Sequence, residues 1–374
     1  MGSRIYLDYN ATAPVRPEVR AAVEPLLLGP LYGNASSVHW AGREAKRHLE
    51  AARRTIAELT DRKFSEVIFT SGGSEADNLA LTGALGGRPQ RVVVSAIEHP
   101  AVLETARQLA KDGVEVELVR VDEDGALDLE DLQLKLQSPT ALVSTMAVNN
   151  ETGVVFDVEA IADLAHAAGA LLHVDAVQAA GRIPLPRQAD LISLSGHKVG
   201  GLKGAGALIT REDLALQPLV FGGPQERGRR AGTENVAAAV SLAEALRVAE
   251  EHRPTEAARL AALQRRLEGA VTALSGRILG GAAPRVSNTT LALFEGIDGE
   301  ALLQALDLEG VAASSGSACS SGSLEPSHVL LAMGLGAEHA LSAVRFSTGW
   351  ATEPTEIEAL AAALPRLVDQ VRAP

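Results

Sequence analysis

The chain has little cysteine and few aromatic residues. Its 374 residues include one cysteine, Cys319, and phenylalanine, tryptophan and tyrosine together make up 3%. A single cysteine excludes a disulfide scaffold and a zinc site built from cysteines. Because aromatic residues are scarce, we expect a core made of alanine, leucine and valine.

Long apolar runs and an excess of positive charge are also missing. No apolar run reaches the roughly 18 residues that a membrane helix needs. The N-terminal sequence MGSRIYLDYN lacks the apolar core of a signal peptide, so we expect a cytoplasmic protein without membrane contact. The formal net charge of −13 argues against a nucleic-acid partner, because binding to phosphates requires a basic surface.

The composition and length fit a globular chain with two domains. Apolar residues make up 46% and charged residues 22%. Between about residues 67 and 210, short β-branched runs alternate with helical stretches, which predicts an α/β fold with a mostly parallel sheet. The expected strands are Val67–Thr70, Arg91–Ser95, Glu115–Val121, Ala141–Val148, Ala170–Val174, Leu191–Leu194 and Ala207–Thr210. The expected helices are Glu75–Leu85, Ala101–Lys111, Asp128–Gln137 and Asp157–Ala168.

The sequence outside residues 67–210 predicts further helices and a second, smaller domain. We expect amphipathic helices over Arg43–Leu59 and Thr233–Glu251, with a helix break at His252-Arg253-Pro254. This break places a large domain at residues 12–253 and a small domain at residues 1–11 and 254–374. The small domain should contain helices at Thr255–Leu274, Gly299–Leu308 and Pro354–Val371 and an extended run at Asn288–Phe294.

Two apolar segments near the middle of the chain each end in a polar residue. Asp175 ends ALLHVDAV and Lys198 follows ADLISLSG, 23 residues later, which is about one strand-to-strand step. Pyridoxal 5′-phosphate chemistry needs this pair: the lysine holds the cofactor as a Schiff base, and the acid keeps its pyridinium nitrogen protonated. The alternative is two solvated residues at strand ends.

The stretch VIFTSGGSEADNLAL (Val67–Leu81) combines a strand, a glycine turn and a helix. Gly72, Gly73 and Ser74 could present backbone N–H groups to a phosphate. The alternative is an ordinary helix with Ser74 as N-cap and Asp77 at the third position.

Further polar residues follow other expected strands. His99 follows RVVVSAIE, where an imidazole could stack on a cofactor ring and move protons, although a structural role is the alternative. Asn150 follows TALVSTMAV, and Gln178 lies three residues beyond Asp175. Ser195 and His197 lie close enough to Lys198 to help hold a phosphate.

Two residues near the C-terminus suggest further chemistry. Cys319 lies in VAASSGSACSSGS, among small polar residues, which indicates an exposed thiol. Exposure favours a reactive role, and a chance surface cysteine is the alternative. Arg345 lies in the strand-like run AVRFSTGW. An arginine there pairs with a carboxylate, either an internal one or that of a substrate.

Together these segments resemble the group I cysteine desulfurases, the NifS/IscS-like branch of the class-V aminotransferases. The resemblance covers nearly the whole chain in ten ordered segments: IYLDYNATAPV, YGNASSVHWAGREA, FTSGGSEADNLA, EHPAV, VNNETGVV, HVDAVQ, SGHK, ERGRRAGTENV, SSGSACSSGSLEPSHVL and VRFSTGW. It implies the fold type I architecture of aspartate aminotransferase and a homodimer that uses pyridoxal 5′-phosphate.

The resemblance also implies individual roles. Lys198 is the Schiff-base lysine, His99 stacks on the ring, Asp175 pairs with the ring nitrogen, and Gln178 contacts the phenolic oxygen. The phosphate is held by Gly73, Ser74, Ser195 and His197, with Thr233 from the other subunit. Asn150 and Arg345 bind the substrate carboxylate, and Cys319 takes the sulfur, with its pKa lowered by His99 or by the cofactor's cationic groups.

The implied reaction converts L-cysteine to L-alanine and leaves a persulfide on Cys319, which a sulfur-acceptor protein of iron–sulfur assembly or of tRNA or cofactor thiolation would then receive. A selenocysteine lyase or a cysteine C–S lyase of the same fold is the alternative. A cofactor-free thiol hydrolase and an inactive relative are more distant ones. The chain departs from the usual pattern at Gly200, Leu202 and Pro224.

Overall fold

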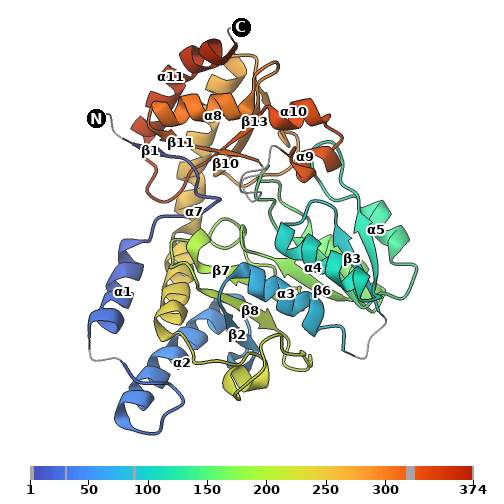
Figure 1. Ribbon diagram of the computed structural model, residues 1–374, viewed down its shortest axis with the longest axis vertical. Helices are drawn as coiled ribbons and strands as arrows, with labels where there is room; N and C mark the ends of the chain where they lie inside the picture. The colour runs from blue at the N-terminus through green and yellow to red at the C-terminus, as the bar shows by residue number, and fades with distance from the viewer. Residues whose placement is uncertain (1–3, 30–31, 87–89, 317–324, 373–374) are drawn as a thin grey trace.

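The computed structural model describes residues 4–29, 32–86, 90–316 and 325–372. It consists of two parts, one above the other in Figure 1. The lower part is built on a seven-stranded sheet and the upper part on a four-stranded sheet. Strand β1, close to the N-terminus, lies in the upper part beside the C-terminal helix α11, so the upper part combines both ends of the described chain.

The large sheet follows the order β2-β8-β7-β6-β5-β3-β4. Strand β8 is antiparallel to both neighbours and the other pairs are parallel, which confirms the mostly parallel sheet expected from the sequence. Successive residues of β3 point into two different apolar clusters, so both faces of the sheet are covered. The strands are β2 Val67–Thr70, β3 Arg91–Ser95, β4 Glu115–Val119, β5 Leu142–Met146, β6 Leu171–Asp175, β7 Leu191–Ser195 and β8 Gly206–Thr210.

Helices pack against both faces of this sheet. Helices α3 and α4 share one apolar cluster with Val92 and Val94, and helices α1, α2, α5 and α6 contribute to the cluster on the other face. Several helices begin where a side chain accepts a backbone N–H, as at Asp128 and Asp157. No helix in the described ranges is both long and apolar enough to cross a membrane. The helices are α1 Pro17–Leu28, α2 Trp40–Thr60, α3 Gly73–Gly83, α4 Pro100–Lys111, α5 Leu129–Lys135 and α6 Val158–Ala167.

Helix α7, Val236–Ala273, runs without interruption from the lower part into the upper part (Figure 1). The predicted helix break at Pro254 is therefore wrong. A proline inside a helix costs about 3 kcal/mol, but packing on both sides of Pro254 offsets this cost. Leu242 and Leu246 are buried in the lower core, and Leu263 and Leu267 in the upper one. The domain division into residues 12–253 and residues 1–11 with 254–374 stays a prediction. The helix break that suggested this boundary is not present.

The upper part has a core of its own. Its sheet has the order β12-β13-β10-β9, and the short strand β1 pairs in parallel with β11. Leu7, Leu302 and Leu360 are fully buried there. The elements are β1 Ile5–Tyr6, β9 Arg277–Ile278, β10 Thr289–Leu293, α8 Gly299–Leu308, β11 Val311–Ala312, β12 Ser314–Ser315, α9 His328–Ala332, α10 Ala337–Leu341, β13 Ala343–Ser347 and α11 Pro354–Arg372.

Candidate active site

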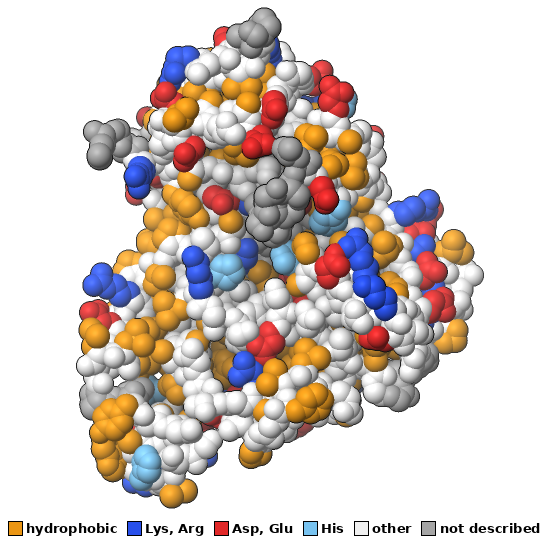
Figure 2. All heavy atoms as spheres, viewed as in Figure 1, with side chains coloured by type: hydrophobic (Ala, Val, Ile, Leu, Met, Phe, Trp, Pro, Cys, Tyr) orange, Lys and Arg blue, Asp and Glu red, His pale blue; other side chains and the backbone are white. Residues whose placement is uncertain are grey.

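A cavity of about 350 Å³ lies where the parallel strands β3, β5, β6 and β7 end. Ligands of open α/β sheets bind at this edge. Figure 2 shows histidine and basic side chains on the visible face where the two parts of the molecule meet. Ten of the residues selected from the sequence line the cavity: Gly73, Ser74, His99, Asn150, Asp175, Gln178, Ser195, His197, Lys198 and Arg345.

Asp175 and Lys198 lie at neighbouring strand ends, as their spacing predicts. Asp175 is the last residue of β6, and Lys198 lies in the single helical turn Gly196–Lys198 that follows the adjacent strand β7. Oδ1 of Asp175 accepts the N–H of Val177 at 2.9 Å. Burial raises the pKa of Asp175 to about 6, against the lowering effects of that N–H and of Lys198. A buried carboxyl beside an amine can thus hold or release a proton near neutral pH.

The glycine turn after β2 leads into helix α3 and leaves space beside the first backbone N–H groups of that helix. Helix α3 begins at Gly73 with Gly72 as N-cap, and no side chain caps it, so the alternative with Ser74 as N-cap is wrong. A Cβ at residue 73 would lie 2.8 Å from Cγ2 of Val177, and a Cβ at Gly206 would lie 2.5 Å from Cα of Gly72. Glycine is needed where backbone approaches so closely. The first backbone N–H groups of α3 are thus available to an anion.

His99 has a structural contact as well as a place in the cavity. It is the N-cap of α4, and its Nδ1 accepts the N–H of Ala101 at 3.1 Å. Because Nδ1 acts as an acceptor, the proton of the neutral ring is on Nε2. Burial, together with Lys198 and His328, lowers the pKa of His99 to about 4. His99 is therefore neutral near pH 7. Its effect on the pKa of Cys319, which lies outside the described residues, stays a prediction.

His197 is also neutral. Burial, together with Lys198 and Lys203, lowers its pKa to about 4, and its Nδ1 is 3.2 Å from Oγ1 of Thr12. A neutral imidazole can act as a hydrogen-bond donor to an anion without adding charge to the cavity.

Arg345 lies on β13 and reaches the cavity from the upper part. Its Nη2 donates to Oδ1 of Asp8 at 2.8 Å, and its Nη1 donates to the carbonyl oxygen of Asn150 at 3.0 Å. The sequence predicts that Arg345 pairs with a carboxylate, and in this structure that carboxylate belongs to Asp8. Nε of Arg345 is buried and has no hydrogen-bond partner among the described residues. The guanidinium as a whole lines the cavity, where it could pair with a carboxylate.

Asn10 is a residue of the site that sequence reasoning missed. Its carbonyl oxygen accepts from Nζ of Lys198 at 2.6 Å and from Nε2 of Gln178 at 3.0 Å. Its Nδ2 donates to the carbonyl oxygen of Asn150 at 3.0 Å. Asn10 thus touches three of the predicted site residues. Its segment has no periodic pattern, and its place in the motif IYLDYNATAPV was the one available signal.

Asp77 is a second residue of the cavity that was overlooked. It is almost fully buried, and its Oδ1 has no hydrogen-bond partner among the described residues. Burial and the nearby Asp175 raise its pKa well above the usual range. Sequence reasoning treated it as a helix-capping residue.

Two predicted residues are not part of this cavity as described. Thr233 is exposed and lines a different hollow, with Gly204 and Arg230. Cys319 lies outside the described residues. The residues on either side of its segment, Gly316 and Glu325, line a neighbouring cavity that shares Asn150 with the first one.

The departures from the family pattern have local structural partners. Gly200 has φ +91°, and a Cβ there would lie 2.5 Å from Cγ of Arg16. Arg16 occupies that space, and its guanidinium lies over the ring of Trp350. The N–H of Leu202 donates to Oγ of Ser241 at 2.7 Å, a bond that a proline could not form. Pro224 precedes the short helical turn Gln225–Gly228.

Comparison with known proteins agrees with this geometry. The family model of the class-V aminotransferases matches residues 5–360. A cysteine desulfurase of Cereibacter sphaeroides is 46% identical over 99% of this chain and 97% of its own length. Cysteine desulfurase 2 of Trichormus variabilis is 45% identical over 99% of this chain and 94% of its own length.

The fold has close counterparts among solved structures. A NifS-like protein superposes with a TM-score of 0.92 at 33% identity, covering 98% of this chain and all of that one. The apo cysteine desulfurase of Thermococcus onnurineus has a TM-score of 0.87 at 26% identity, over 98% of this chain and 95% of its own. The expected fold type I architecture is thus confirmed. The chain belongs to the class-V aminotransferase family and, within it, to the NifS-like cysteine desulfurases.

Proposed function

We propose that this protein is a cysteine desulfurase that converts L-cysteine to L-alanine and collects the sulfur on Cys319 as a persulfide. The observation that carries the proposal is that Lys198, Asp175 and Arg345 line the same cavity. These three side chains provide an amine, a buried carboxyl and a carboxylate-binding guanidinium.

The cavity fits pyridoxal 5′-phosphate, the cofactor implied by the family. The uncapped start of α3 and the missing Cβ of Gly73 leave space and N–H donors for a phosphate. Lys198 would hold the cofactor covalently and Asp175 its ring nitrogen, while His99 would stack on the ring. Gln178 would contact the phenolic oxygen, and the phosphate would be held by Gly73, Ser74, Ser195 and His197.

When bound, the cofactor withdraws electrons from the substrate Cα. Asn150 and Arg345 would bind the substrate carboxylate, because both residues line the cavity. We assign Nζ of Lys198 as the base for the Cα proton, because it lines the cavity. His99 presents its Nε2–H as a donor within the same cavity.

Cys319 carries out the sulfur step in this proposal. Its thiolate attacks the substrate sulfur, so an S–S bond forms and the Cβ–S bond breaks. The electron pair of the broken bond stays on the substrate Cβ, which takes up one proton and becomes the methyl group of alanine. The amine of Lys198 returns a proton to Cα, which completes the product. The sulfur remains on Cys319 until a sulfur-acceptor protein of iron–sulfur assembly or thiolation removes it.

We further propose a cytoplasmic homodimer with a shared site. Thr233, the residue that the resemblance assigns to the partner's phosphate, is exposed and lies outside the cavity of its own subunit. In a dimer, Thr233 of one subunit would reach the cofactor phosphate bound in the cavity of the other subunit.

The test is one turnover with labelled L-cysteine. Protein purified with the cofactor should release about one alanine per sulfur taken up, and mass analysis should find the label on Cys319. Release of free sulfide with Cys319 unmodified would replace this proposal with a C–S lyase. Strong preference for selenocysteine would indicate a selenocysteine lyase.

A further inference from the structure

The carboxyl group of Glu151 lies beside Gly316 and Ser327, which flank the segment that contains Cys319. On one side, Oγ of Ser327 donates to Oε2 of Glu151 at 2.5 Å. On the other side, a Cβ at Gly316 would lie 2.5 Å from the same Oε2. Residues 316 and 327 therefore meet at one oxygen atom, and the chain between them includes Cys319.

Glu151 is held in the lower part of the molecule by its own turn. Oδ1 of the buried Asn149 accepts the N–H of Glu151 at 2.9 Å and the N–H of Thr152 at 3.0 Å. The preceding residue, Asn150, accepts from Arg345 through its carbonyl oxygen. The position of the Glu151 carboxyl is thus tied to the turn that lines the substrate cavity.

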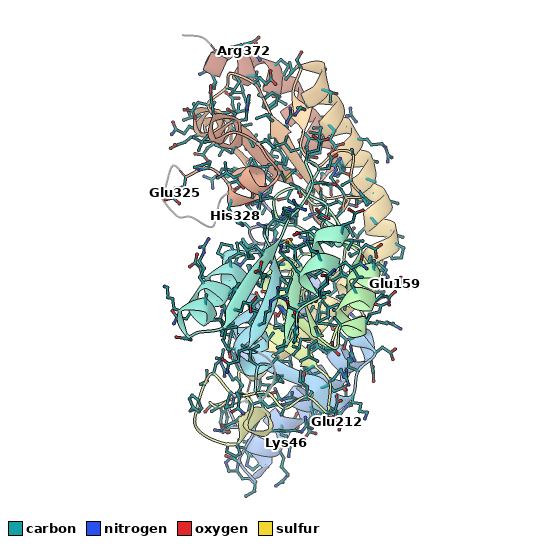
Figure 3. All side chains as sticks on the ribbon, turned by 90° about the vertical axis from the view of Figure 1, so that its right-hand side faces the viewer. Lys46, Glu159, Glu212, Glu325, His328 and Arg372 are labelled. Atoms are coloured by element: carbon teal, nitrogen blue, oxygen red, sulfur yellow. The ribbon has the colours of Figure 1, made fainter. Side chains whose placement is uncertain are left out.

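The helix after the Cys319 segment is fixed to the same region. Ser327 is the N-cap of α9, and Nε2 of His328 is 2.9 Å from the carbonyl oxygen of Glu98. Figure 3 shows Glu325 and His328 at the level where the upper part meets the lower part. The contact therefore joins the two parts beside the cavity.

A buried carboxyl is costly unless a specific interaction compensates for it. Glu151 is 3% exposed, and burial raises its pKa, although the Ser327 hydroxyl, His328 and Arg345 favour the ionised form. An apolar residue would fill this space at a lower cost in desolvation. The polar contact to Ser327, and the close approach that only a glycine at 316 permits, indicate a role in placement.

We propose that Glu151 is a positioning residue for sulfur transfer: it fixes both ends of the Cys319 segment to the turn that binds the substrate carboxylate. The inference rests on the proposed desulfurase function and adds a residue to it. Glu151 acts through Gly316 and Ser327 and does not take part in bond making.

The experiment compares Glu151→Ala and Glu151→Gln with the parent holoenzyme. Three quantities are measured: the absorbance of the bound cofactor, the dissociation constant of L-alanine from its effect on that absorbance, and the single-turnover rate of persulfide formation on Cys319. Glu151→Ala should slow persulfide formation about 10- to 100-fold, the loss that follows when a reacting group is misplaced by about 1 Å. Cofactor absorbance and alanine binding should stay close to the parent values.

The amide of Glu151→Gln can still accept the Ser327 hydroxyl, so this variant should recover most of the rate. Gly316→Ala disturbs the same contact from the other side and should reproduce the slow step of Glu151→Ala. Glu104→Ala is the matched control, because Glu104 is an exposed acid in the same neighbouring cavity and pairs with Arg107. It should leave all three quantities unchanged.

Parental rates in both Glu151→Ala and Gly316→Ala would overturn the inference. A parallel loss of cofactor and alanine binding in Glu151→Ala would also overturn it, because the role would then be general stability. Failure of the parent itself to form a persulfide would reject the proposed function, and this outcome is visible before any variant is made.

Discussion

The carbonyl oxygen of Asn10 accepts a hydrogen bond of 2.6 Å from Nζ of Lys198. The carbonyl oxygen of Ala11 accepts from the same amine at 3.0 Å. Two backbone carbonyls near the N-terminus, 188 and 187 positions away from Lys198, thus hold its amine by hydrogen bonds. This places Lys198 in the cavity with its amine in a defined position.

Lys198→Ala should abolish turnover, because among the described residues Lys198 is the one lysine that lines the cavity. We expect the turnover rate to fall about 10³-fold or more. The yellow colour of the covalently bound cofactor should also be lost. Absorbance spectra and alanine production measure both effects. Lys111→Ala, a change at the exposed last residue of α4, is the control and should behave like the parent. Parental turnover by Lys198→Ala would refute the assignment.

Thr233→Ala should weaken cofactor retention if the partner subunit supplies this hydroxyl. Losing one hydrogen bond to a charged phosphate should raise the dissociation constant of the cofactor about 10-fold. Equilibrium dialysis of the variant and of Thr255→Ala, a change at an exposed threonine on α7, makes the comparison. Sedimentation that finds a fully active monomer with bound cofactor would contradict the shared site.

Cys319→Ala should keep the cofactor and still bind L-cysteine, but it should form no persulfide. The chain has no second cysteine that could substitute. Alanine formation should fall to about 1% of the parent rate or less, the range seen when a nucleophile is removed. Mass analysis after incubation with labelled L-cysteine gives the answer. Substantial alanine production by this variant would favour the lyase alternative.

His173 predicts a pH dependence of stability. It is fully buried beneath the site, its two ring nitrogens lie 2.8 and 2.9 Å from the hydroxyls of Ser144 and Ser193, and burial lowers its pKa to about 3. In the unfolded chain the ring takes up a proton below about pH 6.5, whereas the folded protein excludes it. The stabilising contribution of neutral His173 is therefore present above about pH 6.5 and is lost as the pH falls.

Relative to His173→Gln, the parent should lose about 2 kcal/mol of unfolding free energy between pH 8 and pH 5. Urea unfolding of both proteins at the two pH values, at one protein concentration, measures this difference. A difference that does not change with pH would show that His173 takes up a proton in the folded protein.

The sequence by itself determined the parallel strands, the helices between them and the neighbouring places of Asp175 and Lys198. Their signals are local, because a strand buried on both faces must be apolar along its length and a 23-residue step leads to the next strand. The glycine turn at Gly72 and Gly73 was visible for the same reason. The order of the motifs then identified the family.

Only the tertiary structure decided that α7 continues through Pro254, because packing of Leu246 and Leu263 into two different cores outweighs a local helix-breaking signal. It also decided that Arg345 pairs with Asp8, 337 positions away, and that Asn10 supports Lys198. Contacts between segments so distant leave no periodic trace in the chain. They arise when the upper part folds back onto the end of the large sheet, where β1 and β13 bring Asp8 and Arg345 together.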